Sequence, residues 1–255
     1  MGCLAYLINL PRDVQRCERM HSELATMNIR YERVEAVYGK ALSEAERRTW
    51  YDETTNQRRY HQSLTPGEIG CYASHQQVAQ RLLDSREPYA LVLEDDVHLL
   101  PELHAVLKAV ADLPEQWDMI KLVGRDHEQA IQRWPFPGLN HKTQLIRYRR
   151  APSRTGAYLL SRSGANKLLK QHRPFFRPVD VDIRYWWESG IRLYGVQPYP
   201  ITRSVDSALS TIGAQATKRD TRRWRKLLNQ LFFSIANSAA NRRLQQEVDP
   251  FSALK

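Results

Sequence analysis

The segment YALVLEDD, residues 89–96, contains both the strand and the acidic turn around which the rest of the chain can be interpreted. Its five apolar residues follow Pro88 and predict a short buried strand. Three carboxylates, Glu94, Asp95 and Asp96, come where that strand ends, and open α/β sheets bind ligands at the carboxyl ends of their strands. Carboxylate oxygens favour Mg²⁺ or Mn²⁺ over zinc. The segment therefore predicts either a metal site or a solvated acidic turn.

Helices and strands alternate on both sides of this segment. Residues 4–8 predict a first strand, the apolar spacing over 12–27 predicts a helix, and residues 31–37 predict a second strand. Residues 40–62 are polar with little periodicity, and we expect them to form a surface excursion. Further strands are expected at 119–123, 144–148, 157–160 and 191–196, with helices near 101–112, 163–171 and 180–189. This order predicts an α/β domain with a mostly parallel sheet.

A helix beginning with a capping box is expected before the acidic segment. Thr65 supplies the N-cap hydroxyl, Pro66 the first helical position, and Glu68 the carboxylate three residues after the cap. We expect this helix to run to about Ser85.

The first turns of this helix contain Gly67, Gly70, Ser74 and His75. Each glycine costs a helix about 1 kcal/mol relative to alanine. The pair therefore indicates tight packing or close approach of a ligand. For His75 taken alone, a buried core histidine whose hydrogen bonds are satisfied is the favoured interpretation, and a ligand-binding histidine is the alternative.

Composition limits the class of protein. The chain has 255 residues, enough for one large α/β domain with an appendage, and no apolar run approaches the roughly 18 residues that a membrane span needs. The first residues lack the basic region of a signal peptide. The three cysteines form no CxxC pair, so we expect a reducing, cytoplasmic location.

The net charge of +10 is uneven, because residues 214–255 contribute +6 of it. Within this tail, five apolar residues recur at helical spacing: Trp224, Leu227, Leu228, Leu231 and Ile235. We therefore divide the chain into a domain over 1–213 and a basic amphipathic helical tail over 214–255. Such a tail favours an anionic partner, which can be nucleic acid, an acidic membrane surface or a phosphorylated substrate. Alternatively, it docks on the domain with its basic face in water.

Several motifs together resemble one family. They are residues 7–10 with Arg12 and Arg16, residues 34–39, residues 67–71 with Ser74 and His75, residues 93–97, residues 155–161 and residues 178–180. In this order they resemble the successive motifs of glycosyltransferase family 25, which includes galactosyltransferases of bacterial lipopolysaccharide and lipooligosaccharide. The resemblance covers residues 3–205.

The resemblance implies a GT-A-like nucleotide-sugar-binding domain, a UDP-hexose donor that is most often UDP-galactose, a divalent metal and inversion at the anomeric carbon. It implies ligation of Mn²⁺ (or Mg²⁺) by Asp96 with help from Glu94 or Asp95, of which we expect Glu94. The implied nucleotide-sugar-binding residues are Asn9, Leu10, Arg12, Arg16, Ala36, Gly67, Glu68, Ser74, His75, Glu94, Asp95 and Gly156. Two positions depart from the family pattern: Tyr38 stands where an aspartate is usual, and the acidic motif is Glu-Asp-Asp rather than Asp-x-Asp.

An inverting displacement needs a base for the acceptor hydroxyl. We expect Asp180 in this role, although its place at a helix start also suits a capping carboxylate. The implied acceptor is a lipopolysaccharide or lipooligosaccharide core, and the tail would then bind the anionic cytoplasmic face of the inner membrane. Three alternatives are a basic nucleic-acid-binding protein without catalysis, a sugar-binding homologue that has lost catalysis, and a homologue that uses UDP-glucose. No zinc finger or RNP motif supports nucleic-acid binding.

Overall fold

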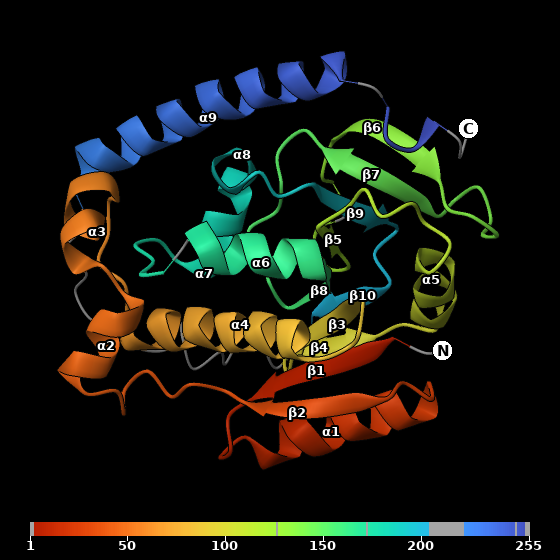
Figure 1. Ribbon diagram of the computed structural model, residues 1–255, viewed down its shortest axis with the longest axis horizontal. Coiled ribbons are helices and arrows are strands. Elements are labelled where there is room, and N and C mark those ends of the chain that lie inside the picture. The colour runs from red at the N-terminus through yellow and green to blue at the C-terminus, as the bar shows by residue number, and fades with distance from the viewer. Residues whose placement is uncertain (1–2, 126, 172, 204–221, 248, 253–255) are drawn as a thin grey trace.

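The computed structural model describes residues 3–125, 127–171, 173–203, 222–247 and 249–252. Its core is an eight-stranded sheet in the order β2-β1-β3-β8-β5-β9-β7-β6, with helices on both faces (Figure 1). The strands are β1 Leu4–Asn9, β2 Tyr31–Glu35, β3 Tyr89–Glu94, β5 Met119–Lys121, β6 Ala130–Pro135, β7 Gln144–Tyr148, β8 Ala157–Ser161 and β9 Leu193–Gln197. The expected α/β fold is confirmed, and β6 is a strand that the sequence pattern did not reveal.

The sheet is mixed, with fewer parallel pairs than the sequence predicted. Strands β2, β1 and β3 are parallel, as are β5 and β9, whereas β8 lies antiparallel between β3 and β5. Strands β7 and β6 complete the other edge in antiparallel pairs. For β6 and β7 the physical reason is that no helix separates them along the chain, and parallel neighbours require a long crossover.

Two hydrophobic cores lie on opposite faces of the sheet, because neighbouring residues of a strand point to opposite sides. Tyr6 belongs to the core that contains Tyr72. The next residue, Leu7, belongs to the core that contains Leu24 and Leu103. The helices that supply these cores are α1 Val14–Thr26, α4 Pro66–Asp84, α5 Glu102–Val110 and α6 Arg162–Gln171.

Residues 40–62 contain two short helices rather than an irregular excursion. Helix α2 spans Glu44–Trp50 and begins with a capping box in which Ser43 and Glu46 exchange hydrogen bonds. Helix α3 spans Glu53–Arg59, and the Asp52 carboxylate accepts a hydrogen bond from the Thr55 amide. Local capping therefore ordered a segment in which we found no hydrophobic periodicity.

Other boundaries differ from expectation near the carboxyl edge of the sheet. Helix α1 begins at Val14, so Arg12 lies on the turn that precedes it. The predicted helix over 12–27 would have placed Arg12 and Arg16 one turn apart on the same helix, which is wrong. A two-stranded sheet pairs β4 Val97–Leu99 with β10 Ile201–Arg203. The expected helix over 180–189 is three short turns: α7 Val179–Asp182, η1 Ile183–Tyr185 and α8 Trp186–Ser189.

Helix α9, Arg223–Gln246, runs along the outside of the molecule in Figure 1, with α3 near its first turns. It contacts the domain through Phe233, which lies in T-shaped contact with Tyr185 and in tilted contact with Trp187. The predicted domain boundary at residues 213–214 lies outside the described residues. Among the helices of the described ranges, none is long and apolar enough to cross a bilayer.

Candidate functional site

A cleft of about 310 Å³ opens where β1 and β3 end. These strands are parallel neighbours, with Ile8 opposite Glu94, so their carboxyl ends share one edge of the sheet. Eleven of the predicted site residues line this cleft: Asn9, Leu10, Arg12, Arg16, Ala36, Gly67, Ser74, His75, Glu94, Asp95 and Asp96. The fold thus gathers, at the edge where α/β sheets bind ligands, residues that are up to 87 positions apart in the sequence.

Asp95 is held at the end of β1. The buried amide of Asn9 donates a hydrogen bond to Asp95 Oδ2 over 2.7 Å, and Arg16 Nη1 lies 3.4 Å from Oδ1. Asn9 itself accepts a hydrogen bond from Arg33 Nε over 3.0 Å. Burial raises the pKa of Asp95, while the Asn9 hydrogen bond and the Arg16 charge oppose that rise. The amide of Asn9 therefore fixes the direction of a carboxylate that faces the cleft.

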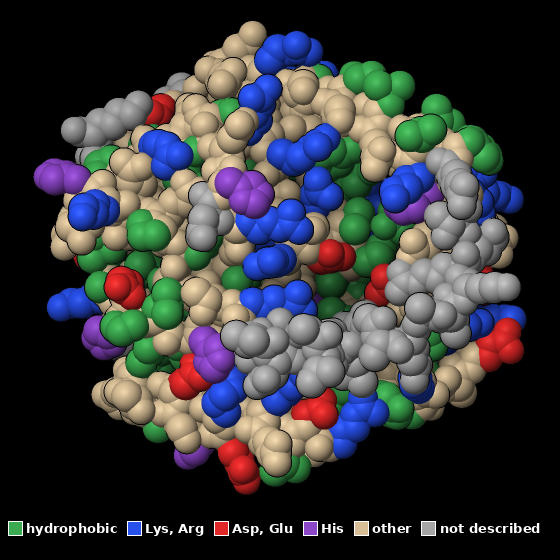
Figure 2. All heavy atoms as spheres, turned by 180° about the vertical axis from the view of Figure 1, so that it is seen from behind, with side chains coloured by type: hydrophobic (Ala, Val, Ile, Leu, Met, Phe, Trp, Pro, Cys, Tyr) green, Lys and Arg blue, Asp and Glu red, His purple; other side chains and the backbone are tan. Residues whose placement is uncertain are grey.

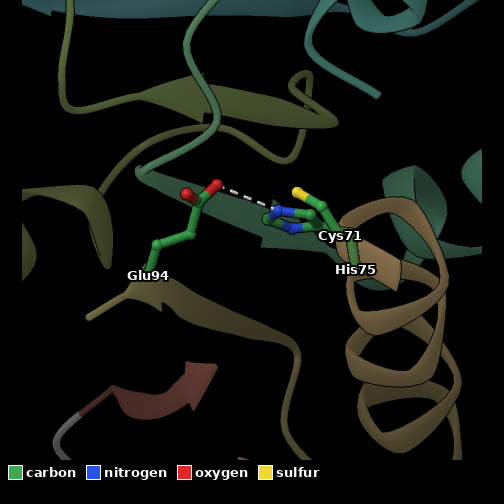
Figure 3. A group of neighbouring side chains, drawn as sticks. All are labelled: Cys71, His75 and Glu94. Atoms are coloured by element: carbon green, nitrogen blue, oxygen red, sulfur yellow. Dashed lines mark hydrogen bonds and ion pairs between the residues drawn. The ribbon is translucent and has the colours of Figure 1, made fainter. Parts of the chain in front are cut away.

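Glu94 accepts hydrogen bonds from His75 on α4 and from Thr155, just before β8; Figure 3 shows the contact with His75. His75 Nε2 lies 3.1 Å from Glu94 Oε1, and the Thr155 hydroxyl donates to the same oxygen over 2.6 Å. The other ring nitrogen, His75 Nδ1, lies 2.8 Å from the Tyr158 hydroxyl. Burial raises the pKa of Glu94, but the hydrogen bonds of His75 and Thr155 outweigh it and hold the pKa below its ordinary value. His75 is therefore a buried histidine with both ring nitrogens hydrogen-bonded, as the core interpretation expected. Its ring also orients the Glu94 carboxylate.

Asp96 is paired with the guanidinium of Arg203, which is 107 positions away in the sequence. Arg203 Nη2 and Nε lie 3.2 and 3.4 Å from Asp96 Oδ2. Burial and the negative charge of Glu94 raise the pKa of Asp96, and Arg203 lowers it. A metal cation at this carboxylate would also reduce the repulsion between the Asp96 and Glu94 carboxylates.

The donor chemistry of Glu94 and Asp96 fits a hard divalent cation. Both supply carboxylate oxygens, and Mg²⁺ or Mn²⁺ binds to one or two carboxylates together with substrate phosphates and waters. A second group, Cys71, His75 and Glu94, has ligand atoms within 4.8 Å of one another (Figure 3). Both ring nitrogens of His75 are engaged in hydrogen bonds, and burial raises the pKa of the Cys71 thiol well above its usual range. In the described structure, His75 and Glu94 of this second group are therefore joined by a hydrogen bond beside the Cys71 thiol.

The floor of the cleft is a close contact between α4 and the loop after β2. A Cβ on Gly70 would lie 2.3 Å from Val37 O, and one on Gly39 would lie 1.7 Å from Pro66 O. The Ser74 hydroxyl accepts from the Val37 amide over 2.8 Å and donates to Gly70 O. The absence of a side chain at Gly70 thus lets the backbone of α4 pack against the backbone of the loop. The hydrogen bond from the Val37 amide to Ser74 holds the loop in place.

Basic side chains border the acidic group. Arg12, Arg16, Lys40 and Arg203 all line the cleft. The guanidinium of Arg12 lies 4.6 Å from the centre of the Tyr38 ring, which forms a flat cationic and aromatic surface at the rim. On the face of the molecule shown in Figure 2, Lys and Arg side chains gather beside a hollow that has acidic side chains at its margin.

Three predicted site residues do not line the cleft. Glu68 completes the capping box, where its Oε2 accepts from the Thr65 amide over 2.7 Å. Gly156 lies behind Asp96, since its carbonyl accepts from the Glu94 amide and a Cβ there would be 3.9 Å from Asp96 Oδ1. The third is Asp180, on α7.

Asp180 is a largely buried carboxylate whose pKa is raised. Burial raises its pKa to about 6, the charge of Lys121 opposes that rise, and the charges of Glu68 and Glu94 add to it. Its helix has Pro178 at the N-cap and no side-chain cap hydrogen bond. Lys121 is fully buried on β5, donates to Pro152 O over 2.7 Å, and has a pKa lowered by burial to about 7.

Asp182, two residues on, is structural. It is buried and accepts hydrogen bonds from the Tyr72 hydroxyl over 2.5 Å and from Arg177 Nε over 2.7 Å. The two aspartates of α7 therefore differ in surroundings although they share a helical turn.

Sequence reasoning missed Arg203, Lys40 and Thr155, and it gave no role to Lys121. No local motif marks Arg203, which meets Asp96 across 107 positions of sequence. A lysine within the apolar run that predicts β5 was the one available signal for Lys121, because lysine is almost never fully buried without a partner.

The comparisons with known proteins agree with the motif order. The sequence model of the family described as "Glycosyltransferase family 25 (LPS biosynthesis protein)" matches residues 4–183. The chain belongs to glycosyltransferase family 25. The resemblance expected from the motifs is confirmed.

Individual relatives of this family 25 chain include procollagen galactosyltransferase 2 of Mus musculus, 32% identical over 184 residues. The match covers 69% of this chain and 29% of that protein, so the chain spans less than a third of the relative's length. A probable inactive glycosyltransferase 25 family member 3 of Bos taurus is 31% identical, covering 69% of this chain and 30% of that protein. A solved structure of a Drosophila β-1,4-galactosyltransferase 7 mutant with manganese, UDP-Gal and xylobiose has a TM-score of 0.45 at 9% identity, covering 85% of this chain and 76% of that one.

Proposed function

We propose that this family 25 protein is a metal-dependent, inverting glycosyltransferase that moves a hexose, galactose, from a UDP-sugar to an acceptor sugar. The observation that carries the proposal is the meeting of carboxylates and arginines in one cleft at the carboxyl ends of β1 and β3. A nucleoside diphosphate is an anion that needs such cations, and its metal needs such carboxylates. The names of the procollagen galactosyltransferase relatives support galactose as the sugar.

The donor half of the cleft follows from its contacts. Asp96 and Glu94 would hold the divalent cation, which neutralises charge that develops on the diphosphate when the sugar–phosphate bond breaks. Arg16 is placed to contact a phosphate oxygen beside Asp95. Asp95, oriented by Asn9, presents a carboxylate oxygen to ribose hydroxyls, and the surface formed by Arg12 and Tyr38 offers a stacking face for the uracil ring. The remaining lining residues, including Leu10, Ala36 and Gly67, shape the wall.

Asp180 is the proposed base. In a single displacement, its carboxylate takes the proton of the acceptor hydroxyl, the hydroxyl oxygen bonds to the anomeric carbon, and the bond from that carbon to the phosphate oxygen breaks to release UDP. A base with a pKa of about 6 is ionised at neutral pH and still basic enough to accept a proton. The attack comes from the side opposite the leaving group, which inverts the anomeric carbon.

For the acceptor, we propose a lipopolysaccharide or lipooligosaccharide core, as the family description suggests. The enzyme would then work in the cytoplasm, at the inner-membrane face where this glycolipid is extended. We retain residues 1–213 as the catalytic unit and 214–255 as the tail in this proposal.

The test is a panel of UDP-sugars incubated with the protein in the presence of Mn²⁺, of Mg²⁺ and of a chelator, with released UDP measured. We expect slow hydrolysis of UDP-galactose that the chelator abolishes. Faster hydrolysis of UDP-glucose than of UDP-galactose would show that glucose, not galactose, is the donor sugar. Failure to bind any UDP-sugar, together with DNA binding that weakens steeply with salt, would favour the nucleic-acid alternative. The anomeric configuration of a transferred sugar, determined by NMR, tests inversion.

A further inference from the structure

Helix α9 turns its apolar side away from the protein. Six large apolar residues on this helix are 54–68% exposed, and we call them the outer ridge: Trp224, Leu227, Leu228, Leu231, Phe232 and Ile235. In the rest of the described chain, the only other exposed large hydrophobic residues are Val14 and Tyr38. An isolated exposed leucine is ordinary, but a contiguous stripe of this kind marks an interaction surface.

The opposite side of α9 is polar, and it is the side that holds the domain. The buried amides of Asn237 and Asn241 both donate to Arg149 O, over 2.8 and 2.9 Å. Asn229 donates to Arg59 O over 3.0 Å. Phe233 is buried on this side against Tyr185 and Trp187. Leu244, on the same side, is half-buried at a cavity between α9 and the domain, and Phe232 at the edge of the ridge also lines that cavity.

This orientation is the reverse of the usual one, in which a surface helix packs its apolar stripe on the core. Rotating α9 to bury the outer ridge would remove the hydrogen bonds of Asn237 and Asn241 and expose Phe233, and it would leave Arg149 O without these donors. The contacts therefore lock the ridge outward.

The charge of the helix selects the kind of partner. Helix α9 contains five basic residues and no acidic one. Arg242 is exposed and lies five helical turns after Trp224, on the same line of the helix. A second copy of the chain would bring two such basic helices together, which like-charge repulsion opposes, whereas an anionic bilayer supplies both the apolar layer and the opposite charge.

We propose that the outer ridge inserts into the interface of a bilayer that contains anionic lipid, with α9 bound in the orientation seen here. The proposal needs no glycosyltransferase activity, so it stands or fails apart from the proposed reaction. It also fixes geometry, because Phe233 joins α9 to the turns η1 and α8 that directly follow Asp180. The part of the domain where the acceptor is proposed to react would thus be tied to the membrane surface.

The experiment is flotation of the full-length protein with vesicles of phosphatidylcholine alone and of phosphatidylcholine containing phosphatidylglycerol. We expect binding to the anionic vesicles in about 0.1 M NaCl, weaker binding in about 0.5 M NaCl, and little binding to the neutral vesicles. The double variant Leu227→Gln/Leu231→Gln should bind roughly 100-fold more weakly, about tenfold for each leucine withheld from the lipid.

Val14→Gln is the control, because it removes an apolar side chain that is also more than half exposed but lies on α1, and it should bind vesicles as the wild type does. Melting temperature and UDP binding of the double variant should match the wild type, since both leucines are exposed. Equal vesicle binding by the double variant would overturn the proposal. So would a wild-type dimer, detected by light scattering, that the double variant converts to a monomer without any vesicle binding.

Discussion

Glu94 and Asp96 are separated by one residue, yet they are held by different parts of the chain. Glu94 is bound to His75 and Thr155 through one oxygen, whereas Asp96 is paired with the partly exposed Arg203. Of the two, Asp96 is the carboxylate whose partner can move aside for another cation, because Arg203 lies at the cleft and its side chain is 43% exposed.

Replacement of Asp96 tests the metal site directly. Asp96→Asn removes one ligand charge while keeping the side chain's size, so we expect UDP-sugar hydrolysis to fall by about 100-fold or more. The stimulation of UDP binding by Mn²⁺, followed by calorimetry, should be lost as well. Asp84→Asn, on the exposed end of α4, is the control. Near wild-type turnover at saturating Mn²⁺ would show that Asp96 is not a metal ligand.

Replacement of Asp180 tests the base. A carboxylate with a pKa of about 6 accepts protons only when ionised, so turnover should fall as the pH drops through about 6. Asp180→Asn should lower kcat by about two to four orders of magnitude and flatten this acidic limb, with donor affinity unchanged.

Stability distinguishes this role from a structural one. The pKa of Asp180 is raised in the folded protein, so its ionisation opposes folding and that cost is present above the folded pKa. Asp180→Asn should therefore melt no lower than the wild type at pH 7. Asp182→Asn breaks a buried pair with Arg177 and should cost about 3 kcal/mol or more. Equal loss of stability in both variants would favour a purely structural Asp180.

Lys121 should tune that base without touching substrate. Its charge lowers the pKa of Asp180, so Lys121→Met should move the acidic limb of the pH–kcat profile to higher pH. The exposed Lys108→Met on α5 is the matched control. An unshifted limb, with kcat reduced equally at all pH values, would assign Lys121 to packing alone.

Among the elements, α4 and the loop after β2 depend on contact between their backbones. Gly70→Ala would gain about 1 kcal/mol of helix propensity if only the helix mattered. A Cβ only 2.3 Å from Val37 O must instead push the loop and helix apart. We expect a lower melting temperature and weaker UDP binding, measured by calorimetry, and little change for Gln80→Ala on the same helix. A stabilised Gly70→Ala would mean that the loop yields freely.

The elements that sequence reasoning found are those with a local signature. The apolar runs before Asn9 and before Glu94 predicted β1 and β3, and the Thr65–Glu68 capping box predicted the start of α4. The same motif at Ser43 and Glu46 went unused, because the surrounding residues have no apolar stripe. Three-residue strands such as β10 are too short for alternation to show.

The site was predicted to the extent that its residues belong to local motifs. The acidic turn and the small residues of α4 meet as expected. Other contacts depend on strand order: those of Glu94 with His75 and Thr155, and that of Asp96 with Arg203. The sequence of a single strand does not reveal that β8 pairs antiparallel with β3. Glu68 was compatible with two roles in the sequence, a helix cap and a nucleotide-sugar-binding residue. In the structure its carboxylate completes the capping box of α4.

At the scale of the whole molecule, the cleft and the tail should separate in function. No described residue beyond Arg203 lines the cleft. A chain truncated after Gly213 should therefore bind UDP as the full chain does, although loss of Phe233 uncovers Tyr185 and Trp187 and should lower the melting temperature. Calorimetry and thermal denaturation measure the two effects. Loss of UDP binding in a truncated chain that still melts cooperatively would make the tail part of the donor site.

The place of β8 in the sheet has a consequence for the order of events during synthesis. Strands β1, β2 and β3 and helix α4 are all complete in the first 94 residues, but β3 has an unpaired edge until residues 157–161 exist. Thr155 and Tyr158, which hold Glu94 and His75, come from that same late stretch. Residues 4–94 must therefore wait, with an open strand and an unfinished cleft, until about sixty more residues have been synthesised. Translation speed over that interval, rather than the stability of the finished protein, sets how long the edge of β3 is open to wrong partners.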